Sequence, residues 1–164
     1  MTNRKRNQKG FSLIELLVVV SIILIVAAIA IPNLLQARVA ANEASAVGSL
    51  RTINTAEISY IDNFPTVGFA PALANLGGAN CAAPDQNGAC FIDNLLSSGT
   101  KSGYTFSSNG VGTAPVSEYV AVGSPISGNG NRSFCSTEDG VIHYDPTGSN
   151  IPDHDSCIAL TQLQ

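Results

Sequence analysis

The chain has 164 residues, of which 45% are hydrophobic, with twelve acidic and eight basic side chains and a formal net charge of −4. Half of the basic residues lie among the first ten, so the rest of the chain carries four basic and twelve acidic side chains, a net charge of −8. An acidic chain without a basic cluster is not expected to bind nucleic acid directly.

The basic N-terminal segment ends at Gly10, and an apolar stretch from Phe11 to Ile31 follows at once. As a helix this stretch would be about 31 Å long, enough to cross the hydrocarbon core of a membrane once. The preceding basic residues are expected to keep that end in the cytoplasm. The remainder of the chain would then lie outside the cytoplasm.

A single carboxylate, Glu15, interrupts this apolar stretch. A charge near the centre of a membrane helix costs about 2.5–3.5 kcal/mol on insertion scales. If the chain were cut after Gly10, the new amine of Phe11 would lie about one helical turn from Glu15. The ammonium and the carboxylate would then offset the cost of burying each other, within one chain or between neighbouring chains.

This arrangement of a basic leader, Gly10, Phe11 and a glutamate at the fifth position of the cleaved chain resembles the type IV prepilin signature. In that family, which includes type IV pilins and type II secretion pseudopilins, a prepilin peptidase cuts after the glycine and N-methylates the new Phe. The resemblance implies cleavage between Gly10 and Phe11, N-methylation of Phe11, and pairing of Glu15 with the Phe11 amine of an adjacent subunit during filament assembly. It covers about the first 50–60 residues.

An ordinary signal peptide or a plain membrane anchor is the alternative for this segment. A signal peptide is cut after its apolar part at small residues, and the run from Ala27 to Ala30 could serve. Either alternative leaves Glu15 unexplained.

Pro32 cannot donate a hydrogen bond to the carbonyl of Ala28, and a kink is predicted there. In assembled pilins the segment before this proline can lose helicity, which the resemblance would place at residues 27–31. Helical spacing resumes in an amphipathic half over residues 32–61, whose predicted core stripe is Ala40, Ala44, Val47, Leu50 and Ile53. The spacing places Glu43, Arg51 and Glu57 on other faces, in solvent or in pairs between subunits, and Gly48 predicts a close backbone contact.

Beyond residue 62 glycine, proline, asparagine and serine become frequent, which indicates loops and short strands. A helical turn is predicted at residues 72–76, and Thr137–Gly140 predicts a hairpin turn. Strand-like segments are 104–106, 118–122, 133–135 and 141–144. The predicted fold class is α+β, a long kinked helix on a small antiparallel sheet whose other face is more polar. The expected parts are a leader (1–10), a membrane or filament-core half-helix (11–31), an amphipathic half-helix (32–61) and a globular β domain (62–164).

Four cysteines in an extracytoplasmic domain predict two disulfides with three possible connectivities, of which we favour the sequential one. Loop closure would contribute roughly 2.7 kcal/mol for Cys81–Cys90 and 3.4 kcal/mol for Cys135–Cys157. The second pair resembles the C-terminal disulfide loop of many pilins. A zinc site is disfavoured because the sequence has no C-x-x-C pair.

The sequence carries no recognisable catalytic constellation, phosphate-binding loop or dinucleotide fingerprint, so neither enzymatic activity nor a cofactor is expected. Asp153 and Asp155, on either side of His154, are weak candidates for cation ligands. A polar surface loop is the simpler interpretation of these residues.

The expected function is a structural subunit of a type IV pilus, which forms a filament with copies of itself. Before assembly the chain would be held in the bacterial inner membrane by one span, and its partners would be prepilin peptidase and the inner-membrane assembly machinery. One alternative is a type II secretion pseudopilin in a periplasmic pseudopilus. The chain lacks tryptophan and the aromatic-rich acidic loop typical of the major pseudopilins. A second alternative is a membrane-anchored exported domain that never polymerises.

Overall fold

The computed structural model describes residues 10–78, 81 and 83–163. It forms two compact units, one that ends at Ala37 and one that begins at Arg38. Helix α1 (Leu13–Asn63) contributes residues to both. We describe each unit separately.

In the first unit α1 is helical without interruption through Pro32. The side-chain amide of Asn33, the residue after the proline, donates to the carbonyl of Ile29 at 3.0 Å. This bond gives a polar side chain a partner on its own helix, in a region that is otherwise apolar. A kink at Pro32 and a loss of helicity in an assembled filament stay predictions.

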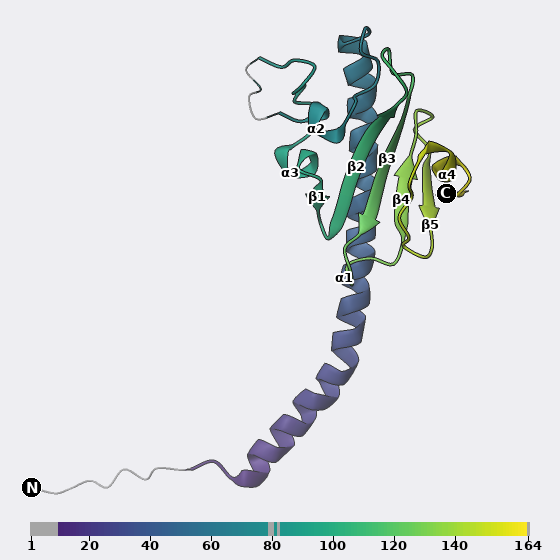
Figure 1. The fold of residues 1–164 in the computed structure, drawn as a ribbon. Coiled ribbons are helices and arrows are strands. Elements are labelled where there is room, and N and C mark those ends of the chain that lie inside the picture. The colour runs from purple at the N-terminus through teal and green to yellow at the C-terminus, as the bar shows by residue number, and fades with distance from the viewer. Residues whose placement is uncertain (1–9, 79–80, 82, 164) are drawn as a thin grey trace, which may run out of the picture. The chain divides into compact units, whose positions relative to one another are not determined.

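The second unit is an α+β domain, as predicted (Figure 1). Among the described residues it contains one antiparallel sheet of six strands that follow one another in sequence order. The predicted sheet had three or four strands, because the first and last strands have only two residues each and show no periodicity. The strands are β1 (Thr100–Lys101), β2 (Tyr104–Val111), β3 (Glu118–Pro125), β4 (Ser133–Ser136), β5 (Ile142–Asp145) and β6 (Thr161–Gln162).

Three short helices accompany the sheet in the described part of this unit: α2 (Leu73–Leu76), α3 (Asn94–Ser97) and α4 (His154–Ile158). Helix α2 matches the predicted helical turn, and Gly77 follows it as the C-cap residue. The sequence prediction missed α3 and α4. Their signals are Asp93 and Asp153, whose carboxylates cap the two helices by accepting backbone N–H bonds.

One face of the sheet packs on the second part of α1. The core of this layer includes large aromatic side chains from the strands, Tyr104, Phe106 and Phe134. From α1 it takes Leu50 and Ile53 as predicted, but Ala40 and Ala44 are exposed. The buried stripe is therefore rotated from the predicted one and comprises Glu43, Ala46, Ser49, Leu50, Ile53, Asn54, Ala56, Glu57 and Tyr60.

The expectation that Glu43 and Glu57 lie on a solvated face is wrong. Glu43 forms an ion pair with Arg132, with 2.7 Å between Nη2 and Oε2. Glu57 is fully buried and accepts hydrogen bonds from the backbone N–H of Ala70 at 2.8 Å and the hydroxyl of Ser108 at 2.7 Å. Each of these buried carboxyl groups has specific donors, which offset part of the cost of its burial.

The expected close backbone contact at Gly48 is also absent within the described part of the chain. A methyl group at this position would meet nothing within 4 Å. The residue lies on the exposed side of α1.

The other face of the sheet is less polar than predicted. Helix α4 lies against β3, β4 and β5 on this side (Figure 1). Beneath it a second cluster of buried side chains forms around the disulfide partners Cys135 and Cys157, with Val120, Val122 and Ile151.

Candidate functional site

The N-terminal end of α1 is built around Ser12 and Glu15. The helix begins at Leu13, and the backbone N–H of Ser12 donates to Oε2 of Glu15 at 3.1 Å. This is the glutamate half of a capping box, in which a carboxylate three residues into the helix satisfies the N–H of the N-cap residue. The Ser-x-x-Glu spacing from Ser12 to Glu15 is the sequence signal for this bond, and the sequence prediction did not include it.

The position of Glu15 also suits the helix dipole. A carboxylate in the first turn lies where the partial positive charge of the helix N-terminus is concentrated. Gly10 and Phe11 precede the helix and are exposed, Phe11 at 90%. The peptide bond between them is therefore outside regular structure.

The helix that follows presents apolar side chains on all its sides. An 18-residue window has a mean hydropathy of 3.1, and none of that window is buried in the described chain. The hydroxyl group of Ser21, in this apolar part of the helix, donates to the carbonyl of Leu17 at 2.8 Å and so needs no partner outside the helix. A surface of this size requires lipid or other protein to cover it.

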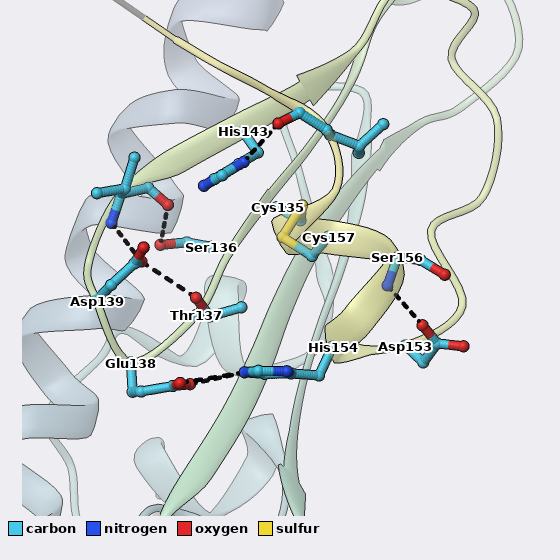
Figure 2. Close-up of a disulfide and its surroundings, with 12 residues drawn as sticks. Cys135, Ser136, Thr137, Glu138, Asp139, His143, Asp153, His154, Ser156 and Cys157 are labelled. Atoms are coloured by element: carbon cyan, nitrogen blue, oxygen red, sulfur yellow. Dashed lines mark hydrogen bonds and ion pairs between the residues drawn. A yellow bond between two sulfur atoms is a disulfide. The ribbon is translucent and has the colours of Figure 1, made fainter.

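The structure joins Cys81 to Cys90 and Cys135 to Cys157, the connectivity favoured from the sequence. Figure 2 shows that the second disulfide fastens α4 to β4. Both of its cysteines are fully buried. The disulfide thus attaches the C-terminal segment to the interior of the domain.

The candidate cation ligands Asp153 and Asp155 do not lie together around a common cation site. Asp153 accepts the backbone N–H of Ser156 at 2.8 Å and caps α4 (Figure 2). The side chain of Asp155 is 97% exposed. Within residues 10–78, 81 and 83–163, no group of three or more His, Cys, Asp or Glu side chains is placed to hold a metal ion.

A second link between α4 and the sheet comes from His154. Its Nε2 lies 3.0 Å from Oε2 of Glu138, in the turn between β4 and β5 (Figure 2). Burial lowers the pKa of His154, but the neighbouring Glu138 carboxylate outweighs it and the pKa is raised overall. The two residues are sixteen apart in sequence, so no local pattern predicts the pair.

Comparisons with known proteins found a family model that matches the N-terminal region and two similar chains. The family model described as "Prokaryotic N-terminal methylation motif" matches residues 5–31. The chain is 47% identical over 73 residues to the "Type IV wide pilus major component PilA4" of Thermus thermophilus, covering 44% of this chain and 56% of that protein. It is 38% identical over 93 residues to the "Type IV major pilin protein PilA" of Myxococcus xanthus, covering 52% of this chain and 41% of that protein.

The chain thus spans about half the length of the curated relatives it matches. These matches agree with the exposed apolar helix and with the α+β domain. The chain carries the prokaryotic N-terminal methylation motif, and over the matched residues it is similar to type IV pilins.

Proposed function

We propose that this chain is a structural subunit of a type IV pilus filament. The observation that carries the proposal is the first part of α1, which is apolar on all sides, lies largely within the matched methylation motif and contains one charged residue, Glu15. Such a helix can be covered by lipid before assembly and by copies of itself afterwards. The names of the two similar pilins support the same role.

In this proposal prepilin peptidase removes residues 1–10 and N-methylates Phe11. Residues 11–31 hold the chain in the inner membrane, with the C-terminal domain outside the cytoplasm, until the assembly machinery transfers it to the filament. Residues 32–61 and 62–164 form the packed helix and domain of each subunit. The role is structural and requires no catalytic group.

Glu15 would then form an ion pair with the Phe11 amine of the neighbouring subunit. A carboxylate can accept about four hydrogen bonds, so the bond from Ser12 leaves room for an ammonium group. The pair would remove an unfavourable buried charge from each of the two chains.

The test replaces Glu15 with Ala or with Gln in the full chain. We expect both variants to be cut after Gly10, because the scissile bond is unchanged, while the yield of sheared filaments falls about tenfold or more. Gln keeps an oxygen that can accept the Ser12 N–H but has no charge. The measurements are filament yield and the N-terminal mass of the membrane-bound protein.

The Gln variant is the matched control that separates the two roles of Glu15. If Gln restores assembly, the helix cap matters and the charge does not, which contradicts the proposed ion pair. Normal filament yield from Glu15→Ala would contradict a polymerising role for this residue and favour a membrane-anchored domain.

A further inference from the structure

We propose that successive subunits contact one another through two grooves of opposite charge, with Arg51 of one copy against Glu118 and Asp155 of the next. This inference rests on the proposed filament function. Both grooves belong to the second compact unit, so their positions within it are defined.

The first groove, called here the cationic groove, is lined by Ala40, Glu43, Ala44, Val47, Arg51, Arg132 and Leu163 and has a volume of about 330 Å³. Arg132 is engaged within its own chain. It pairs with Glu43, and its guanidinium group lies 5.4 Å and 5.5 Å from the ring centres of Phe134 and Tyr144. Arg51 is exposed, so its positive charge remains available in a groove where the charges of Arg132 and Glu43 offset each other.

Positive charge is scarce in the chain once the leader is excluded. Four basic side chains remain beside twelve acidic ones. In the part of the chain that the structure describes, Lys101 pairs with Asp93 and Arg132 with Glu43. Copies of a chain with this balance repel one another unless a cation on one meets an acidic surface on the next. The other two basic residues, Arg38 and Arg51, are both exposed, and of these Arg51 lines a groove of the domain. The positions of these two residues therefore restrict which faces can meet.

The second groove, called here the acidic groove, has a volume of about 530 Å³ and includes Val111, Glu118, Val120, Asp153, His154 and Asp155. Its three carboxylates outnumber its one histidine, which is paired with Glu138. The ends of β2 and β3 form one side, and the start of α4 forms the other. Glu118 is exposed and the side chain of Asp155 is 97% exposed, so both carboxylates can reach a partner. Like the cationic groove, it combines apolar contacts with charge.

The two grooves lie toward opposite ends of the domain. Near one end of this part of α1 the hydroxyls of Ser45 and Ser102 are 3.0 Å apart, and about 18 Å further along the helix Glu57 accepts a bond from Ser108. Helix α1 therefore runs alongside β2 (Figure 1). The cationic groove lies at the level of residues 44–51, whereas the acidic groove lies beyond Ser108, at the end of β2.

This separation determines the kind of contact. Two copies of the same groove carry net charge of the same sign and repel each other, so the contact joins the cationic groove of one chain to the acidic groove of the next. Each pair of chains then has one cationic and one acidic groove left unoccupied. Such a head-to-tail contact repeats into a closed ring or into an open helical filament, and the filament is the outcome that the proposed function requires. A second copy of this chain is therefore the occupant that fits both grooves.

The experiment exchanges the charges in the full chain, using Arg51→Glu, Glu118→Arg and the double variant. We expect each single variant to lower the yield of sheared filaments about tenfold or more, because each places like charges together. The double variant reverses both charges and should recover most of the wild-type yield. Both side chains are exposed, so the domain is expected to fold in every variant.

The matched control is Arg51→Glu combined with Asp62→Arg. Asp62 is exposed near the end of α1 and lines neither groove, so this control has the same net charge as the double exchange. It should remain as poorly assembled as Arg51→Glu alone. The N-terminal mass of each membrane-bound variant is measured in parallel.

Normal yield from Arg51→Glu, or a double exchange no better than the Asp62 control, would overturn the contact. Loss of filaments from Glu118→Arg alone, with Arg51→Glu unaffected, would also overturn it and indicate that the acidic groove binds a different cationic partner. If Arg51→Glu does not accumulate, Glu118→Arg provides the test, with Asp62→Arg as the control for the same change in net charge. Absence of methylated Phe11 from the wild-type chain would instead count against the proposed function.

Discussion

The free energy of unfolding of the C-terminal domain is expected to fall by about 3 kcal/mol as the pH rises from 4.5 to 7. The cause is Glu57, whose carboxyl group is fully buried in the layer between α1 and the sheet. Burial raises its pKa from 4.5 to about 7, although the bonds from Ala70 and Ser108 act in the opposite direction. Each factor of ten in proton affinity corresponds to about 1.4 kcal/mol.

The sign follows from the difference in bound protons. Between pH 4.5 and 7 the folded chain keeps the proton on Glu57, whereas the unfolded chain has lost it. Raising the pH therefore favours the unfolded state across this window, and the stabilising contribution is gone above pH 7. His154, whose pKa is raised above 6.5, contributes stability that is also lost as the pH rises through the upper end of this range.

The measurement is urea denaturation of the cleaved chain in detergent at several pH values, followed by tyrosine circular dichroism. Glu57→Gln should remove most of the slope, because the amide cannot ionise, and leave only the part due to His154. Asp62→Asn, which changes an exposed carboxyl group near the end of α1, is the control and should keep the wild-type slope. A flat wild-type profile, or an unchanged slope in Glu57→Gln, would contradict the assignment to Glu57.

Removing the Cys135–Cys157 disulfide is expected to lower the free energy of unfolding by about 3–4 kcal/mol. Closing the chain between these residues, 22 apart, contributes about 3.4 kcal/mol through the entropy of the unfolded state. Replacing two fully buried sulfur atoms with serine hydroxyls adds a smaller loss. We expect α4 to separate from β4 before the rest of the domain unfolds.

The comparison is Cys135→Ser/Cys157→Ser against Cys81→Ser/Cys90→Ser, each measured by denaturation. The second pair is only 9 residues apart, and Cys81 is exposed, so its removal should cost about 2.7 kcal/mol or less. An equal or larger loss from the Cys81–Cys90 pair would show that burial around α4 contributes less than the structure indicates.

The sequence was most informative where a local pattern has one physical solution. An apolar stretch of 21 residues predicts a helix, and the turn from Thr137 to Gly140 predicts the hairpin between β4 and β5. The sequential disulfide connectivity was favoured among three possibilities, and for Cys135–Cys157 a family resemblance supported it. These features depend on neighbouring residues, which the sequence displays directly.

The sequence was least informative where a charged residue lies in the core. Glu43 and Glu57 share the helical spacing of Leu50, Ile53 and Tyr60 and belong to the buried stripe. Their charge suggested exposure to solvent. The donors that allow their burial could not be identified from the sequence, because these donors are distant in the chain or lie in a loop. Arg132 is 89 residues from Glu43, and Ser108 is 51 from Glu57. The Ser12–Glu15 cap, in contrast, has a local signal and could have been predicted.

The most direct test of the central claim is mass spectrometry of the N-terminus of protein sheared from the cell surface. The proposed pilus subunit predicts a chain that begins at N-methylated Phe11 and lacks residues 1–10. The same terminus found only in membranes would indicate a processed subunit outside a surface pilus and favour a secretion pseudopilin. An intact leader, or cleavage after Ala30, would contradict the account.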